Sequence, residues 1–496
     1  MSFSSTQGRV AGPALMAASL AIAVLAAGCA DTAGIASHAR IRDAAEAGVP
    51  AAAPQPNDFA QIDAQWWRAF GDSQLDALEQ QALAASPSLQ VAQARVAKAL
   101  AATGVAEAAG RPQLSGDAQL LRQRYSENYI YSSLGGTVQE NGTLQLNGSW
   151  ELDFFGRNRA AIQAAVGSAR AAEADAQAAR ILLATNVARS YIQWARLEAQ
   201  RDVARRTLAQ REETLRLVRD RVSAGLDTQL EQRQSEGGLP EARQQLEALN
   251  EQIENARHAL DALVAVPDAT ARLAAPSLAA LQPVPLATQI PTDLLARRPD
   301  VAAARWRVEA AARDEDRARA EFYPNINLTA FVGTQAIGFD NLLKSGSRQW
   351  GVGPALHLPI FEGGRLRANL GGKAADHDAA IESYNGAVID AVHEVADQVS
   401  SVRSIGRQQA EQRSAQRSAE DAYQIALQRY QAGLGTYLNV LTAETAVLSQ
   451  RRQAVDLAAR ALDTQASLAR ALGGGWAGDA PAAAQAAALN ESAAVR

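Results

Sequence analysis

The sequence predicts an internally duplicated α+β membrane protein in which each chain supplies four β-strands to a barrel that other copies complete. Three observations predict it. Landmarks recur in the same order in the two halves of the chain, four strand-length stretches alternate polar and apolar residues, and a very long helical pattern follows each pair of stretches. A duplicated supersecondary unit of this kind indicates a pseudo-symmetric architecture in which each half alone is incomplete.

The clearest repeat is a decapeptide. Arg221–Leu230 reads RVSAGLDTQL, and Arg429–Leu438 reads RYQAGLGTYL. Leu152–Arg157 (LDFFGR) has a counterpart in Leu358–Arg365 (LPIFEGGR). The predicted division of the chain is a signal peptide at 1–28, a tether at 29–60, a first repeat at 61–270, a second repeat at 271–475 and a loose tail at 476–496.

Composition excludes several classes of protein. The net charge is −5 and Lys and Arg do not cluster, so the chain is not expected to bind nucleic acid. Aromatic residues make up only 5% of the chain, which favours thin seams between helices over one thick core. The five histidines have no metal-ligand spacing and no catalytic set is evident, so we expect no enzymatic activity, metal or cofactor.

The single cysteine, Cys29, follows an export signal. Val10 to Ala27 is mostly small and apolar after the positive Arg9, and it leads into Leu25-Ala-Ala-Gly-Cys29. This segment resembles a bacterial lipoprotein signal that is cut before Cys29, whose sulfur takes acyl chains such as palmitate. The alternative is an ordinary signal peptide with an incidental cysteine. Ala30 after the cysteine implies, by the same resemblance, sorting to the outer membrane, where the acyl chains would give a stable anchor.

Four stretches alternate polar and apolar residues with a period of two, at about the length of a tilted membrane-spanning strand. They are Gln113–Leu120, Thr143–Phe154, Asn325–Val332 and Val352–Ile360. The third has one exception, because Phe331 lies on its polar side. A strand of a soluble sandwich would show the same alternation, and that alternative stays open on the strands alone.

Long helices are expected to begin at Gly156-Arg157 and at Gly364-Arg365. The stretch from Arg365 to Gln431 contains no proline, and it would extend about 100 Å as a helix. Apolar residues recur there with a seven-residue beat, and the beat resumes after Gly433, which indicates coiled-coil packing. The positions are Ile381, Val388, Val392, Val395, Val399 and Val402, and then Leu438, Leu441, Leu448, Val455, Leu462 and Ala469.

The two kinds of element constrain each other. A strand in lipid must have every backbone group paired, and four strands cannot close a barrel. Two copies would give an eight-stranded barrel with a filled interior, whereas three would give twelve strands and room for a pore. The helices are too polar to cross a bilayer, so they are expected to project into the periplasm as a tube that continues the barrel. A solid coiled-coil stalk is the alternative.

The repeated decapeptide lies where each long helix turns back. Gly225 and Gly433 fit a left-handed helix C-cap, while Thr228 and Thr436 fit the N-cap of the next helix. These roles do not explain the recurring leucines, which are Leu226, Leu230, Leu434 and Leu438. Exposed leucines at a hairpin tip favour a docking surface, with plain turn geometry as the alternative.

Further motifs carry a resemblance to a known family. They are Trp66-Trp-Arg-Ala-Phe-Gly-Asp72, Leu294-Leu-Ala-Arg-Arg-Pro-Asp-Val301, Phe322-Tyr-Pro324, Pro359-Ile-Phe-Glu-Gly-Gly364 and Arg429-Tyr-Gln-Ala-Gly433. With Cys29 they resemble the TolC-like outer-membrane factors, in the lipoprotein branch that serves RND-type efflux pumps. The resemblance implies a homotrimer with a 12-strand β-barrel and a 12-helix periplasmic α-barrel. It also implies that an inner-membrane pump supplies the energy and that a periplasmic adaptor docks at the helical tips.

The resemblance also implies a gate at the tips. The family's tyrosine matches Tyr430 and its acidic residue matches Glu231, so we expect a hydrogen bond between their side chains across neighbouring hairpins. Closure by apolar contacts among Leu230, Leu438 and Leu441 is the alternative. Aspartates often follow the family's second turn. Asn439 and Thr442 stand there, so we expect a neutral constriction unless Glu444 faces inward.

The function expected from the sequence is a passive conduit for small toxic compounds in a tripartite efflux system of the outer membrane. The polar face of all four strands favours a water-lined channel over a non-conducting structural lipoprotein of the envelope. An exit duct for type I protein secretion would share the same scaffold. Chemical selection of the exported substrate is expected to occur mainly in the pump.

Overall fold

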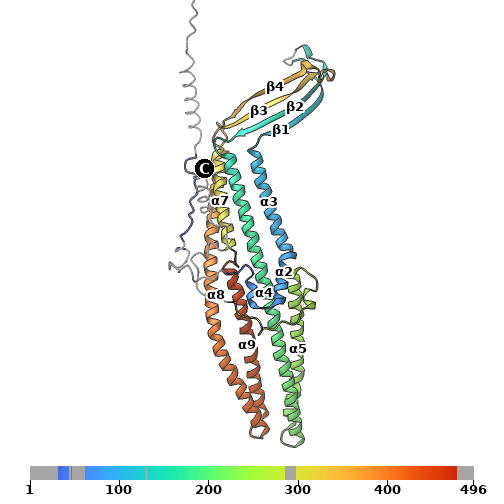
Figure 1. The fold of residues 1–496 in the computed structure, drawn as a ribbon, viewed down its shortest axis with the longest axis vertical. Helices are drawn as coiled ribbons and strands as arrows, with labels where there is room; N and C mark the ends of the chain where they lie inside the picture. The colour runs from blue at the N-terminus through green and yellow to red at the C-terminus, as the bar shows by residue number, and fades with distance from the viewer. Residues whose placement is uncertain (1–31, 44–45, 47–61, 129–131, 285–297, 477–496) are drawn as a thin grey trace, which may run out of the picture. The chain divides into compact units, whose positions relative to one another are not determined.

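The computed structural model describes residues 32–43, 46, 62–128, 132–284 and 298–476, and it consists of long helices and one antiparallel sheet (Figure 1). The predicted signal peptide, Cys29, most of the tether and nearly all of the tail lie outside these residues. In the described part of the chain, no helix combines the length and apolarity that a membrane span requires.

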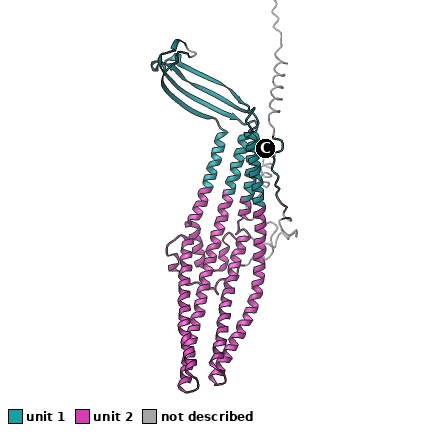
Figure 2. Ribbon diagram, turned by 180° about the vertical axis from the view of Figure 1, so that it is seen from behind, with its two compact units in different colours: residues 1–41, 96–171, 304–384 teal, residues 42–95, 172–303, 385–496 magenta. Residues whose placement is uncertain are grey.

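The chain divides into two compact units (Figure 2). One comprises residues 1–41, 96–171 and 304–384, and the other comprises 42–95, 172–303 and 385–496. Each unit takes segments from both predicted repeats, so duplication in sequence does not give one unit per repeat. Four of the five boundaries between the units fall inside helices, which are α3 (Pro87–Ala109), α4 (Arg157–Ser223), α7 (Pro299–Ala320) and α8 (Arg365–Gln431).

All four predicted strands are present, in the first unit. They are β1 (Gln113–Arg124), β2 (Val138–Leu152), β3 (Asn325–Ile337) and β4 (Arg348–His357). The sheet is antiparallel throughout, in the order β1-β2-β3-β4. The fourth strand lies a few residues earlier than the predicted stretch Val352–Ile360, since it begins at Arg348 and ends at His357. Pro359, two residues later, has no backbone N–H for the ladder. Among the described residues, the outer edges of β1 and β4 pair with no other strand.

The two faces of the sheet differ in chemistry. On one face, Asn147 Nδ2 donates to Asp117 Oδ2 at 2.5 Å and Gln349 Nε2 donates to Gln145 Oε1 at 2.9 Å. The other face is apolar and exposed, and it carries Leu114, Leu144, Leu146, Trp150, Val332, Trp350, Val352 and Leu356. Phe331 is an apolar residue on the polar face, as are Leu121 and Ile337, and its ring occupies the space that a Cβ on the paired Gly351 would need.

Both long helices begin at the predicted residues, Arg157 and Arg365, and each contains 67 residues. At the start of α4, the carboxylate of Asp153 accepts hydrogen bonds from the backbone N–H groups of Asn158 and Arg159, at 3.2 and 2.9 Å. A carboxylate there satisfies free donors and complements the helix dipole. The return helices are α5 (Gln229–Val264) and α9 (Tyr437–Ala471), so the second unit holds the ends of two hairpins.

The Trp66–Asp72 motif has a structural role in the second unit. Trp66, Trp67 and Phe70 form the buried helix η1 (Trp66–Phe70), and Gly71 has a φ of 74° that ends it. Asp72 then caps α2 (Ser73–Ala85) and accepts a 2.8 Å hydrogen bond from the Tyr191 hydroxyl of α4. The motif therefore fixes the first helices of the described chain against α4.

Arg298, Pro299 and Asp300, near the end of the motif Leu294–Val301, also have a structural role. Pro299 is the first residue of α7, where its missing N–H costs no hydrogen bond. The buried Arg298 donates to Glu394 Oε2 on α8 at 2.8 Å and to the Ala471 carbonyl of α9 at 3.0 Å. Its Nη2 also lies 2.6 Å from Asp300 Oδ2. Arg298 therefore joins three helices, α7, α8 and α9.

The predicted apolar seam of the helices is partly wrong. In α8 the positions from Ile381 to Val399 are buried as expected. Near the start of α9, however, the buried positions are Tyr437, Val440, Glu444 and Val447, whereas Leu438 is exposed and Leu441 and Leu448 are half-buried. The seam is offset by about one residue at this end, where the rings of Tyr430 and Tyr437 contact each other across the turn. Farther along α9, Leu462 and Ala469 are buried as expected.

Candidate gate and docking site at the helical tips

The two hairpin turns have the same backbone geometry, and it is the geometry that the repeat predicts. Gly225 and Gly433 have φ angles of 71° and 75°, the left-handed conformation that glycine adopts without a steric penalty. The N–H of Leu226 donates to the Arg221 carbonyl at 2.9 Å, and the N–H of Leu434 donates to the Arg429 carbonyl at 2.7 Å. These bonds close each long helix with the same C-terminal motif.

The two helix starts that follow the turns differ. Thr228 and Glu231 form a capping box, in which Leu230 N–H donates to Thr228 Oγ1 at 3.2 Å and Thr228 N–H donates to Glu231 Oε2 at 2.9 Å. Thr436 occupies the N-cap position of α9, but its side chain makes no capping hydrogen bond. The prediction of a threonine cap therefore holds in full only for the first turn.

Tyr430 has a different partner from the one expected. Its hydroxyl donates to Oδ2 of Asp227, in the other turn of the same chain, and the ring is fully buried. The predicted bond to Glu231 is wrong within the chain, because the capping box already uses the Glu231 carboxylate. Asp227 also accepts from Arg221 Nε at 2.9 Å, and the Arg221 guanidinium lies 4.6 Å from the centre of the Tyr430 ring. Arg221, Asp227 and Tyr430, called the tip triad below, join the two hairpins.

Electrostatics in the tip triad favour the ionised aspartate. Burial raises the pKa of Asp227, but hydrogen bonds from Arg221 and Tyr430 outweigh it, so the net pKa lies below the usual 3.8. Burial and the adjacent carboxylate both raise the pKa of the Tyr430 phenol. At neutral pH the triad is therefore an arginine cation, an aspartate anion and a neutral phenol that donates its proton. Hydrogen bonds to charged partners are the stronger class.

A second link lies farther from the turns. Arg211 of α4 donates from Nε to Glu444 Oε1 of α9 at 3.1 Å and from Nη1 to the Gly238 carbonyl of α5 at 2.8 Å. Glu444 is buried, and desolvation raises its pKa in spite of Arg211. Glu444 therefore does not extend into open space on this chain. Asn439 and Thr442, the expected constriction residues, are uncharged positions on α9.

Four leucines at the turns are exposed, as expected for a docking surface. The exposed fractions are 64% for Leu226, 62% for Leu230, 68% for Leu434 and 61% for Leu438. They flank a buried cluster in which Val218, Tyr430, Tyr437 and Val440 pack together. Large apolar side chains that remain exposed beside a well-packed cluster are typical of a surface that a partner covers.

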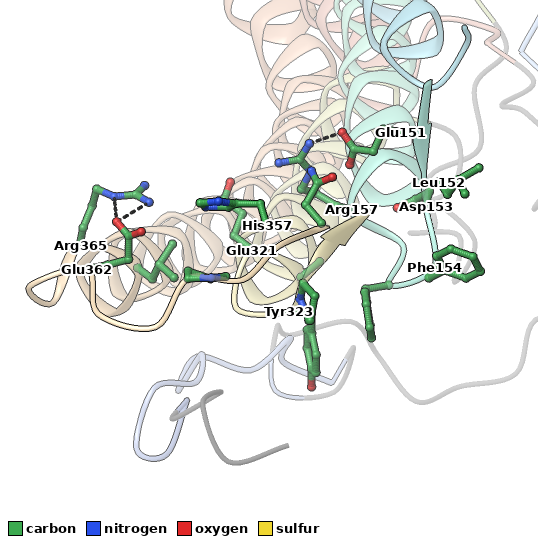
Figure 3. A pocket seen from close by; sticks show the side chains of 16 residues that line it. Glu151, Leu152, Asp153, Phe154, Arg157, Glu321, Tyr323, His357, Glu362 and Arg365 are labelled. Atoms are coloured by element: carbon green, nitrogen blue, oxygen red, sulfur yellow. Dashed lines mark hydrogen bonds and ion pairs between the residues drawn. The ribbon is translucent and has the colours of Figure 1, made fainter. Parts of the chain in front are cut away.

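The bases of the strands form a second feature, within the first unit (Figure 3). A hollow of about 300 Å³ lies where β2 leads into α4 and β4 leads toward α8. Two ion pairs line it, since Arg157 lies 2.5 Å from Glu151 and Arg365 lies 3.0 Å from Glu362. The described residues contain no group of three or more side chains that could hold a metal ion.

Sequence reasoning missed Asp227, Arg221 and Arg211. Two signals could have indicated Asp227. Thr228-x-x-Glu231 has the pattern of a capping box, which assigns Glu231 to the helix start and leaves Asp227 for Tyr430. The repeat also has Gly435 where the first copy has Asp227, so this position has diverged between otherwise similar turns. Arg211 had no such signal, because one arginine among many on a helix is not distinctive.

Comparison with known proteins agrees with this architecture. The family model described as outer membrane efflux protein matches residues 78–266 and 290–474, one stretch in each predicted repeat. The chain is 41% identical over 364 residues to the fusaric acid resistance protein FusA of Burkholderia cepacia, and the match covers 72% of this chain and 68% of FusA. It is 32% identical over 419 residues to the pyoverdine export outer membrane protein OpmQ of Pseudomonas aeruginosa, covering 84% and 88%.

Solved structures show the same fold. The outer membrane protein VceC of Vibrio cholerae matches with a TM-score of 0.78 and 38% identity, over 84% of this chain and 100% of VceC. The members of the family are outer-membrane channels rather than enzymes. The chain therefore belongs to the outer membrane efflux protein family, and it is an outer-membrane efflux channel.

Proposed function

We propose that three copies of this chain form a 12-strand barrel in the outer membrane, continuous with a 12-helix tunnel in the periplasm. Small toxic compounds pass through it passively, while an inner-membrane pump of the RND type supplies the energy through a periplasmic adaptor. The observation that carries the proposal is the sheet, which has one polar face, one exposed apolar face and two unpaired outer edges among the described residues.

Such a sheet is incomplete in a membrane. Unpaired backbone groups at the edges of β1 and β4 would each cost several kcal/mol in hydrocarbon. Pairing β4 of one copy with β1 of the next removes both edges, and twelve strands leave an open lumen. The side chains of Asp117, Gln145 and Asn147 would then face water, and the face that holds Trp150 and Trp350 would contact lipid.

The substrate class is inferred from relatives. FusA is named for resistance to fusaric acid and OpmQ for export of pyoverdine, and other relatives are named as multidrug resistance proteins. Small organic compounds are common to these names. The constriction would not select among them by charge, because the residues expected there, Asn439 and Thr442, are uncharged.

Mass measurement and conductance together test this proposal. Mass analysis of the protein in mild detergent should give a trimer as the main species. The same preparation in planar bilayers should produce single-channel currents. A stable monomer as the main species would contradict the barrel, and trimers that insert without conducting would support a structural role in the envelope instead.

Adaptor docking is proposed for the exposed leucines at the tips. Replacing Leu226 and Leu434 with Asp places charge in an apolar contact, while the triad and the buried cluster remain intact. We expect trimers in normal amounts, with loss of adaptor co-purification and of efflux. Gly433→Pro is a second variant, because proline cannot adopt the φ of 75° at this cap. Wild-type efflux and co-purification in both variants, at equal expression, would contradict docking at the tips.

Gating is proposed for the tip triad, because it is the contact that joins the two hairpins at their ends. A hydrogen bond from Tyr430 to ionised Asp227 is worth about 1.5–3 kcal/mol when shielded from water. Three such bonds in a trimer could hold the tunnel closed and still yield to adaptor binding. Tyr430→Phe keeps the packing of the ring and removes the bond, so we expect more frequent channel openings and greater sensitivity to vancomycin.

Asp227→Asn and Glu231→Gln form a matched pair for the same test. Asn at 227 weakens the acceptor of both triad bonds, and Gln at 231 changes only the capping box. We expect increased opening in the first variant and little change in the second. Unchanged conductance in Tyr430→Phe and Asp227→Asn would contradict the triad as a gate and favour closure by apolar contacts of Leu230, Leu438 and Leu441.

Lipid attachment at Cys29 remains a prediction, since this residue lies outside the described chain. Cys29→Ser should abolish metabolic labelling with palmitate, because acyl transfer requires the thiol. Barrel insertion should persist if trimer assembly is sufficient for it. Labelling that survives the substitution would contradict a lipoprotein.

A further inference from the structure

Helix α5 contains residues that disfavour a helix, whereas α9 contains none. The stretch Gly237-Gly238-Leu239-Pro240 lies within α5, which nevertheless continues as a helix from Gln229 to Val264. No glycine or proline occurs between Tyr437 and Ala471 of α9. The two return helices are otherwise matched, since they contain 36 and 35 residues and follow turns of the same geometry.

This stretch weakens the helix in two ways. Pro240 has no N–H, so the carbonyl of Glu236 loses its helical donor, and the proline ring crowds the preceding turn. Glycine has the lowest helix propensity after proline, because it loses the most backbone freedom on folding. Two adjacent glycines before a proline are a common cause of a kink or a hinge in a long helix.

Neither glycine is required by the surroundings. A Cβ added to Gly237 would meet nothing within 4 Å, and one added to Gly238 would lie 3.6 Å from Arg211 Nη1, an ordinary contact. Both residues lie within a continuous helix, and neither has a positive φ. Packing within the chain and turn geometry therefore do not explain the glycines, and the property that they contribute to α5 is low stiffness.

Arg211 holds the helix at this weak stretch. Its Nη1 donates to the Gly238 carbonyl at 2.8 Å and lies 3.1 Å from Glu241 Oε2, while its Nε donates to Glu444 Oε1 at 3.1 Å. One guanidinium thus ties α4, the weak stretch of α5 and α9 together. The side chain of Arg211 is only 14% exposed and that of Glu444 only 9%, so water competes little for these bonds.

The part of the hairpin beyond this stretch is held to the second hairpin by several contacts. Among them are the tip triad, a hydrogen bond between Ser235 and Tyr437, and the packing of Val218 in the buried tyrosine cluster. This part begins with Asp227 in the tip triad and includes Leu230, which is exposed for docking. Releasing the triad would remove the charged contact between the ends of the two hairpins, while Arg211 would still hold α5 at the weak stretch. The weak stretch is therefore placed where the end of α5 can turn when the tip opens.

We propose that residues Gly237–Pro240 form a hinge in α5 and that Arg211 is a positioning residue, which holds this hinge in its closed setting. The inference rests on the proposed gate at the tips. On opening, the end of the α4–α5 hairpin moves about the hinge, whereas the α8–α9 hairpin has no matching point and moves as a stiffer element.

Hydrogen–deuterium exchange of the purified full-length trimer tests the hinge without reference to transport. Backbone amides of residues 236–242 should exchange at least about tenfold faster than those of the matched stretch 444–450 in α9. The double variant Gly237→Ala/Pro240→Ala restores helix propensity at two positions, and the methyl group added at 237 meets no atom within 4 Å. It should remove most of the difference. Equal exchange in the two stretches of the wild-type protein would overturn the hinge in favour of a static kink.

Conductance in a background with the triad released separates the hinge from the gate. Tyr430→Phe is expected to raise the open probability, and adding Gly237→Ala/Pro240→Ala should reverse roughly half or more of that increase. If Tyr430→Phe alone changes nothing, the proposed gate fails. If Tyr430→Phe opens the channel and the stiffened helix has no effect on it, the gate stands and the hinge fails.

The role of Arg211 is tested with a charge-neutral pair. Arg211→Gln/Glu444→Gln removes the guanidinium without leaving a buried unpaired carboxylate. We expect faster exchange at 236–242 and more frequent opening, and both effects should disappear when Gly237→Ala/Pro240→Ala is added. A purely structural role would destabilise the trimer in both backgrounds alike, and that result would contradict positioning through the hinge.

Discussion

The two hairpin tips have the same backbone geometry but contribute different side chains to the contact between them. Both long helices end in a left-handed glycine, Gly225 or Gly433, with the same closing hydrogen bond. The first tip, however, supplies the charges of the triad, Arg221 and Asp227, whereas the second supplies the ring of Tyr430. The equivalent arginine, Arg429, is exposed and donates to the Leu434 carbonyl of its own turn, at 3.2 Å.

This difference separates the positions that are the same in the two repeats from the positions that differ. Positions that set the turn are the same in both copies, and positions that join the copies have diverged, with Asp227 opposite Gly435 and Val222 opposite Tyr430. Each tip therefore supplies a different part of the contact between the hairpins, with the charged pair on the first and the phenol on the second.

The largest expected effect comes from removing one arginine and not the other. Arg221→Ala leaves Asp227 without its cation and removes the contact over the Tyr430 ring. Breaking a buried pair costs about 3–5 kcal/mol in a protein interior, and we expect about 2 kcal/mol at a tip near solvent. That is roughly a 30-fold shift toward opening. Single-channel open probability is the measurement.

Arg429→Ala is the matched control, because Arg429 has the same place in its turn but lies exposed. We expect its open probability to stay within about twofold of wild type, as for surface substitutions of about 0.5 kcal/mol or less. Equal effects of the two substitutions would show that the arginines act by charge at the tip in general and would remove the distinction between the hairpins.

Acidification should release the same contact at a defined pH. Hydrogen bonds from Arg221 and Tyr430 lower the pKa of Asp227, so the stabilising effect of its carboxylate is complete above its usual value of 3.8 and declines as pH falls through the lowered value. We expect an open probability that is flat from neutral pH to about 5 and rises below 3.8. Asp227→Asn should not show this rise, and a rise of equal size in that variant would assign it to another group.

How much the sequence predicts depends on how local each signal is. The starts of both long helices, the glycine caps and the four strands follow from neighbouring residues, so they could be predicted. The partner of Tyr430 depends on which of two carboxylates four residues apart faces the second hairpin. The capping box settles that choice, because it uses the carboxylate of Glu231. A match of Glu231 to the family's acidic residue does not take the capping box into account.

Packing between distant helices was harder to predict. At the start of α9 a seven-residue beat fits two neighbouring phases, and the observed phase is the one in which the rings of Tyr430 and Tyr437 lie in contact, 5.9 Å apart. The Arg211 link joins residues far apart in the chain, and no short motif marks it. Such contacts follow from the register of three helices together, which a single sequence pattern does not supply.

Replacing the threonine at the N-cap position of each return helix should have a smaller effect on stability. Thr228→Ala destroys a capping box, and substitutions of this kind cost about 1 kcal/mol. Thr436→Ala removes a side chain that makes no capping bond, so it should cost only a few tenths of that amount. Hydrogen exchange in the first turns of α5 and α9 measures both, with about fivefold faster exchange expected only for Thr228→Ala. Equal acceleration would mean that Thr436 caps α9 in solution.

The smallest effect is expected from making the second turn resemble the first. Gly435→Asp places a carboxylate at the position equivalent to Asp227, where the φ is not positive and the nearest side-chain atom to a Cβ is the Arg429 Cβ at 3.5 Å. Arg429 could then pair with it, but both groups would be exposed, so the gain should not exceed about 0.5 kcal/mol. We expect a barely raised melting temperature and an unchanged open probability, because the new pair would lie within one hairpin and would not join it to the other. A clear fall in open probability would show that the new carboxylate forms a second contact between the hairpins. The second turn could then support such a contact as well as the first.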